Sequence, residues 1–110
     1  MAVISNLAVD QGTNVTVTLS VTDDTGSARD LTGYTGRAQL RRSYYSTTNT
    51  AFTVSINDPT SGVVILSLNA TQTANLKAGR YVYDVELVSN SYSVERVVEG
   101  IVTVYPEVTK

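Results

Sequence analysis

The 110-residue sequence contains no histidine, no cysteine and no tryptophan. Without histidine it lacks the commonest general base near neutral pH and the commonest transition-metal ligand, so Ser-His-Asp and Cys-His mechanisms are excluded. Without cysteine there is no thiol nucleophile and no zinc–thiolate site, and the fold does not depend on oxidation. We therefore expect no enzymatic activity, no catalytic residue, no cofactor and no metal ion.

Charge and long apolar runs are also scarce. Only 16% of the residues are charged and the formal net charge is -2, whereas phosphate binding needs clustered Lys and Arg. No apolar stretch approaches the ~20 residues of a membrane helix, and residues 1–10 have neither the basic start nor the apolar run of a signal peptide. We predict a soluble protein made in the cytoplasm, with neither nucleic acid nor membrane as a partner.

The sequence is rich instead in strict alternation of apolar and polar residues, which is typical of half-buried strands. Residues 14–22 alternate Val or Leu with Thr or Ser. In residues 80–88, the side chains expected to point inward are Tyr81, Tyr83, Val85 and Leu87. Further strands are expected over residues 36–45, 52–56, 63–68 and 93–105. Residues 1–9 form another edge strand or a docking arm.

Turn residues separate these runs and set the fold class. Asn, Asp, Pro and Gly are dense in 57–62, which predicts a hairpin between 52–56 and 63–68. Gly100 lies within the last run and indicates a bulge or a close approach. About seven short strands and one short helical turn predict a single all-β domain over residues 1–110, an antiparallel Ig-like β-sandwich. Another Greek-key order of the strands fits the same pattern.

The segment that precedes the 80–88 run has the layout of an immunoglobulin-type corner. In that corner, a Tyr near the start of a strand bonds back to upstream backbone. Leu76, Gly79 and Tyr81 have the expected order, with Tyr81 as the corner tyrosine. Residues 69–79 break the alternation and predict the helical turn, capped by Asn69 or Thr71. The residues expected on its buried face are Ala70, Ala74 and Leu76.

Two acidic groupings have the residue types of catalytic or metal sites. Asp84 and Glu86 share one strand face, and paired carboxylates perform acid–base chemistry when their environments separate their pKa values. We interpret the pair as the solvent face of an amphipathic strand, opposite Arg96 or Arg37. The second grouping flanks a loop and has the residue type that binds a hard cation such as calcium. It lacks the spacing of an EF-hand, and aspartate is ordinary in turns. It consists of Asp23, Asp24 and Asp30.

The segment Arg41-Arg42-Ser43-Tyr44-Tyr45 is the strongest candidate for a contact surface. Basic residues beside exposed tyrosines are frequent at interface hot spots, and they also stack on sugars or bases. Adjacent tyrosines in a strand face opposite ways, so we expect one of them to be exposed. Arg41, Arg42, Tyr44 and Tyr45 are the predicted partner-contact residues.

The order of several segments resembles a known family. The stretch DLTGYTGRAQLR (30–41) precedes a GVVILSL strand (62–68), and the remaining segments are ATQTANL (70–76), GRYVYDVEL (79–87) and VVEGIVTVYPEVT (97–109). This order is similar to the small β-sandwich modules of tailed-bacteriophage virion proteins, such as the N-terminal module of phage baseplate upper proteins. In the larger proteins further domains follow the module, whereas this sequence ends at Lys110.

The resemblance implies a structural role in a virion, without catalysis. A stand-alone module is expected to decorate a capsid or to bridge tail or baseplate components, in many copies on a symmetric assembly. Its partners would be other virion proteins, and its location the virion after synthesis in a bacterial host. The alternative is a carbohydrate-binding adhesion module that uses the same tyrosines.

Overall fold

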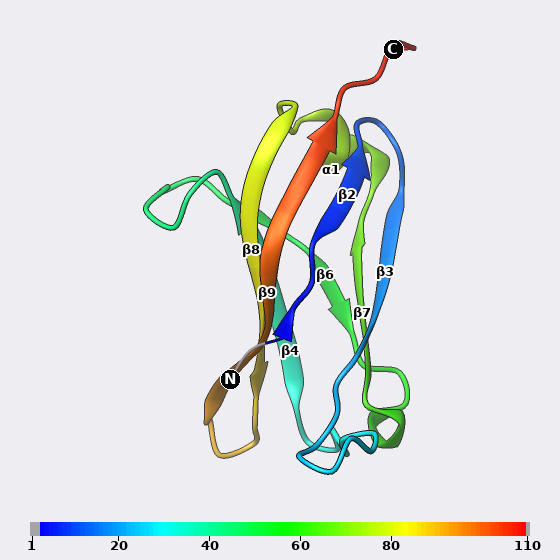
Figure 1. Cartoon of the computed structure of the whole chain (residues 1–110), viewed down its shortest axis with the longest axis vertical. Helices are drawn as coiled ribbons and strands as arrows, with labels where there is room; N and C mark the ends of the chain where they lie inside the picture. The colour runs from blue at the N-terminus through cyan, green and yellow to red at the C-terminus, as the bar shows by residue number, and fades with distance from the viewer. Residues whose placement is uncertain (1–2, 110) are drawn as a thin grey trace.

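Alternation of apolar and polar residues gives each strand one buried face, and a computed structural model of residues 3–109 has two sheets packed face to face (Figure 1). The larger sheet has the order β1 (Val3–Ile4), β9 (Val94–Tyr105), β8 (Gly79–Val88), β4 (Thr35–Arg41) and β5 (Thr50–Ala51), with β2 (Leu7–Asp10) also on β9. The smaller sheet has the order β3 (Val15–Ser20), β7 (Val63–Leu68) and β6 (Thr53–Ser55). A 3₁₀ turn, η1 (Pro59–Ser61), precedes β7, and a short helix, α1 (Ala70–Ala74), follows it.

The strand order is that of an immunoglobulin-type sandwich. Strands β3-β7-β6 face β9-β8-β4 as strands B-E-D face G-F-C in such domains, so the Ig-like prediction is confirmed. The described residues form nine strand segments rather than about seven, because the first run splits into β1 and β2 and the short β5 precedes β6. β1 and β2 run parallel to β9, whereas the other strand pairings are antiparallel.

Residues 3–10 therefore belong to the larger sheet as strands along β9. Residues 1 and 2 of the predicted N-terminal arm lie outside the described residues. Among residues 3–109, no helix has the length and apolar character that crossing a bilayer requires.

The core lies between the two sheets and consists of the inward side chains of the alternating runs. All four inward residues predicted for β8 are buried. From the facing sheet, Val64 and Leu66 of β7 meet them, and both are fully buried. Burying one such aliphatic side chain contributes ~1.5–3 kcal/mol to folding.

The strand expected over 36–45 ends early, which is the main correction to the fold. β4 stops at Arg41, and residues 43–46 form a turn closed by a 3.2 Å hydrogen bond from Ser46 N to Ser43 O. The Ser46 hydroxyl also accepts from Ser43 N at 3.1 Å. Local bonds of this kind compete with a strand ladder. Tyr44 and Tyr45 are consequently outside the sheet, and both are exposed rather than one of the two.

Gly100 marks a close approach, and the bulge lies elsewhere in β9. A Cβ atom on Gly100 would overlap the carbonyl oxygen of Ser5, which lies between β1 and β2 where the chain runs along β9. The same carbonyl accepts the Tyr83 hydroxyl at 2.5 Å. The register between β8 and β9 shifts after Val85, which leaves Val97 as the extra residue of a bulge.

Helix α1 begins at Asn69, the first of the two caps considered. The Asn69 side chain accepts from Gln72 N at 2.8 Å, and the Gln72 side chain accepts from Asn69 N at 2.9 Å, which is a capping box. The buried residues here are Thr73 and Leu76, whereas Ala74, expected inside, is exposed. This helix carries the chain over the end of the sandwich and into the corner before β8.

Candidate functional site

Residues 42–49, which connect β4 to β5, form a loop that projects from the side of the sandwich (Figure 1). We call it the tyrosine loop. Tyr44 and Tyr45 occupy the two central positions of the 43–46 turn, and their exposed fractions are 66% and 95%. The turn therefore exposes two adjacent aromatic side chains on the protein surface, Tyr45 almost completely and Tyr44 by about two thirds.

The two arginines of the predicted contact segment are engaged within the chain. Arg41 donates to the Ser46 carbonyl at 2.5 Å and to the Gln39 side chain at 3.1 Å. Arg42 donates to the Arg80 carbonyl at 3.2 Å. Arg41 and Arg42 thus fix the base of the tyrosine loop, and the tyrosines are the members of the segment that remain free of such bonds among the described residues.

The predicted corner residues lie directly beside this loop. The Tyr81 hydroxyl donates to the Lys77 carbonyl at 2.7 Å, which is the backward bond of a tyrosine corner. The Arg42 guanidinium stacks over the Tyr81 ring, 4.9 Å from its centroid. Gly79 has φ +134°, and a Cβ atom there would meet Arg42 at 2.5 Å. Leu76 is buried in the core cluster. The corner thereby supports Arg42, and through it the loop.

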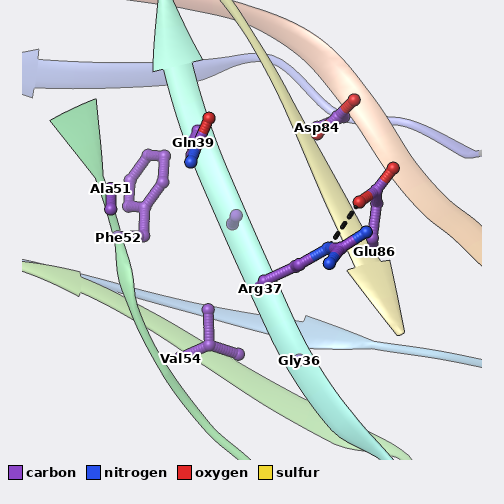
Figure 2. Close-up of a pocket in the computed structure, with 9 residues that line it drawn as sticks. Gly36, Arg37, Gln39, Ala51, Phe52, Val54, Asp84 and Glu86 are labelled. Atoms are coloured by element: carbon purple, nitrogen blue, oxygen red, sulfur yellow. Dashed lines mark hydrogen bonds and ion pairs between the residues drawn. The ribbon is translucent and has the colours of Figure 1, made fainter. Parts of the chain in front are cut away.

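The acidic pair Asp84 and Glu86 borders a cleft of about 410 Å³ beside β4 (Figure 2). Figure 2 shows Arg37 of β4 pointing to Glu86 on the neighbouring strand β8, with which it forms an ion pair of 2.7 Å. Phe52 and Val54 form the other wall, where the chain leaves β5 for the smaller sheet. One wall of the cleft therefore consists of charged side chains from β4 and β8, and the other wall is apolar.

Both carboxylates of this pair have arginine partners. Arg96 on β9 contacts Asp84 at 3.2 Å and Glu99 at 3.6 Å. Partial burial raises the pKa of Asp84, and the charge of Glu86 raises it further against the opposing effect of Arg96. The arrangement is a ladder of ion pairs across three strands, as the interpretation of the pair as an amphipathic strand face predicts.

The loop carboxylates considered for calcium serve their own turns. Asp23 accepts from the backbone and hydroxyl of Thr25, and Asp30 does the same from Thr32. These hydrogen bonds lower the pKa of both carboxyl groups. No three acidic residues within 3–109 are grouped closely enough to hold a metal ion.

Comparison of the chain with models of protein families and with curated proteins finds no match. The resemblance to virion modules therefore stands on the order of sequence segments, and the candidate surfaces stand on their geometry.

Proposed function

We propose that the protein is a non-enzymatic accessory component of a tailed-phage virion, attached to other virion proteins through the tyrosine loop. The observation that supports this function is the pinned turn that exposes Tyr44 and Tyr45 together. Exposed tyrosines bury large areas on binding with little loss of side-chain freedom. A turn fixed by Arg41 and Ser46 lowers the ordering cost further.

The virion assignment draws on the resemblance of residues 30–109 to small virion modules. The absence of histidine and cysteine from the sequence and the arginine partners of Asp84 and Glu86 favour a binding role over catalysis. Replacing both carboxylates by their amides should change no hydrolytic activity. A hydrolase activity that the Asp84→Asn, Glu86→Gln protein loses would contradict the non-enzymatic assignment.

The test is incorporation of a double variant, Tyr44→Ala with Tyr45→Ala, into phage particles. If both rings are hot-spot contacts of ~2 kcal/mol each, the number of copies per particle should fall about tenfold or more. Tyr92→Ala is the matched control, because Tyr92 is 86% exposed on the separate β8–β9 turn. Equal incorporation of the double variant and wild type, with unchanged thermal unfolding, would refute the role of the loop.

Immunogold electron microscopy addresses the position on the particle. Label over the head would support capsid decoration, and label at the tail or neck would support a baseplate or fibre adaptor. A lack of label on both intact and disrupted particles would contradict the virion assignment.

Carbohydrate binding is the second candidate, because Tyr44 lines a polar cleft. The cleft has a volume of about 290 Å³ and includes Gln39, Arg41, Asp84 and Arg96 in its lining. An aromatic ring beside several hydrogen-bonding side chains suits a sugar ring. A glycan array with wild type and Tyr44→Ala tests this function. A saccharide-specific signal that Tyr44→Ala abolishes would support it, and silence across the array would exclude the sugars tested.

A further inference from the structure

Some charged side chains of the molecule form ion pairs, and others have no oppositely charged partner among residues 3–109. The arginines with carboxylate partners are Arg29, Arg37 and Arg96. Among residues 3–109, the basic side chains without an ion pair are Arg41, Arg42, Lys77 and Arg80. These four residues come from two neighbouring segments, the end of β4 with the residue that follows it and the corner with the first residues of β8.

Three of these free basic residues line a single cleft. The cleft has a volume of about 410 Å³ and lies at the base of the tyrosine loop, with Arg41, Arg42 and Lys77 in its wall. No Asp or Glu of residues 3–109 lines it, and the other polar side chains there are hydroxyl and amide groups. Arg80 is adjacent, since its carbonyl accepts from Arg42. We call this feature the basic cleft.

Four carboxylates without an ion pair gather at the opposite end of the long axis. They lie on the β3–β4 loop and the β6–β7 turn: Asp23, Asp24, Asp30 and Asp58. The two segments are joined by a 2.8 Å hydrogen bond from Leu31 N to Pro59 O. Figure 1 shows both at the lower end of the sandwich, while the corner before β8 is at the upper end. We call this the acidic end.

Among residues 3–109, the two other carboxylates without an ion pair lie toward the same end of the sandwich as the corner before β8, because β2 and β9 both end there. Asp10 ends β2 and Glu107 follows β9, and neither lines the basic cleft. The basic character is therefore confined to the cleft, and the acidic end lies toward the other end of a body 44 Å long.

We propose that copies of this chain associate head to tail, with the acidic end of one copy bound in the basic cleft of the next. The 23–26 turn is the inserting element, because it forms the tip of the longest connection at the acidic end. Asp24 provides the carboxylate that contacts the cleft, because its side chain accepts no hydrogen bond from residues 3–109.

A second copy is the occupant that the charges favour, because each molecule carries both halves of the complementary contact. The contact is heterologous, so each bound pair keeps one free basic cleft and one free acidic end. Association therefore continues beyond a dimer, into a ring or a filament. The inference concerns copies of the chain in solution and does not depend on the virion assignment.

Sedimentation velocity over a concentration series tests this association. In ~20 mM salt, the weight-average mass of the wild type should pass the dimer value as concentration rises, and in ~0.5 M salt association should weaken about fivefold or more. A wild type that remains monomeric to ~1 mM would overturn the proposal. A salt-insensitive association that stops at the dimer would overturn it equally.

Two charge-reversal variants identify the surfaces. Lys77→Glu with Arg80→Glu alters the basic cleft, and Asp24→Lys with Asp58→Lys alters the acidic end. Each variant alone should be monomeric, and an equimolar mixture should associate again, because a basic surface then meets an acidic one. Asp10→Lys is the control and should associate like the wild type. A mixture that stays monomeric, or single variants that associate normally, would overturn the head-to-tail contact.

Discussion

Replacing Tyr81 by Phe removes one hydroxyl group from the corner and leaves the ring in place. Tyr81 is 7% exposed, and its hydroxyl donates to the Lys77 carbonyl at 2.7 Å. The variant loses this hydrogen bond and leaves a partly buried carbonyl without its donor, which costs about 1.5 kcal/mol. A domain of 110 residues has an unfolding entropy of about 0.23 kcal/mol/K, so the unfolding temperature should fall by about 6 °C.

Equilibrium unfolding in urea measures the same change as a free energy. The midpoint should fall while the slope of the free energy with urea stays constant, because the surface exposed on unfolding is unchanged. Tyr105→Phe is the matched control, since Tyr105 is 51% exposed and its hydroxyl has no hydrogen bond to residues 3–109. Its stability should stay within ~0.5 kcal/mol of wild type.

A Tyr81→Phe protein with the wild-type midpoint would refute the reasoning. It would mean that water satisfies the Lys77 carbonyl in the folded state and that the corner hydroxyl adds no net stability.

Three further changes have definite expected outcomes. Gly100→Ala should lower the free energy of unfolding by ~1–3 kcal/mol, because the new methyl overlaps the Ser5 carbonyl. Hydrogen exchange of the Ser5 amide, which donates to the Glu99 carbonyl, should accelerate. An unchanged exchange rate would contradict this. Arg29 lowers the pKa of Glu95, so their bond stabilises the fold above pH ~4.5 and is lost as the pH falls through the lowered value. Glu95→Gln should therefore remove ~0.5–1 kcal/mol of stability at pH 7 and very little at pH 2 in urea titrations, whereas an equal loss at both pH values would exclude the charge effect. Asn69→Ala should cost ~1 kcal/mol in thermal unfolding through loss of the capping box, and a cost near zero would show that the cap is dispensable.

The strands with strict alternation could be predicted from the sequence, residue by residue. In β8, a period of two fixes which side chains enter the core, and the long run leaves no competing register. The cap of α1 also follows from local chemistry, because Asn69 and Gln72 have the spacing of a capping box.

Contacts between distant segments could not be predicted in this way. Thr73 is buried and polar, and its hydroxyl finds an acceptor 60 positions away in sequence, the Thr13 carbonyl at 2.8 Å. A five-residue helix has too few turns for periodicity to identify its inner face, so the sequence pattern favours Ala74 as the buried residue, whereas Thr73 is buried in the structure. The parallel pairing of β2 with β9 likewise depends on how the two ends of the chain meet.

For the candidate contact surface, the sequence indicates a segment but not what each of its side chains does in the structure. The composition of segment 41–45 indicates a contact surface. It cannot show that Arg41 donates a hydrogen bond to Ser46 or that Arg42 stacks on the ring of Tyr81. Such pairings depend on the loop conformation, which serine hydrogen bonds determine. The basic cleft depends in turn on the corner that brings Lys77 alongside the loop.

The parallel pairing of the first and last strands has a mechanical consequence. Because β2 runs alongside β9 in the same direction, the start of the first strand and the end of the last lie toward opposite ends of the sandwich (Figure 1). A pull on the two termini is then directed along the strands, and the hydrogen bonds between them bear the force together in shear. Antiparallel terminal strands would separate one bond at a time under the same force. The domain can thus transmit tension along its length before it unfolds.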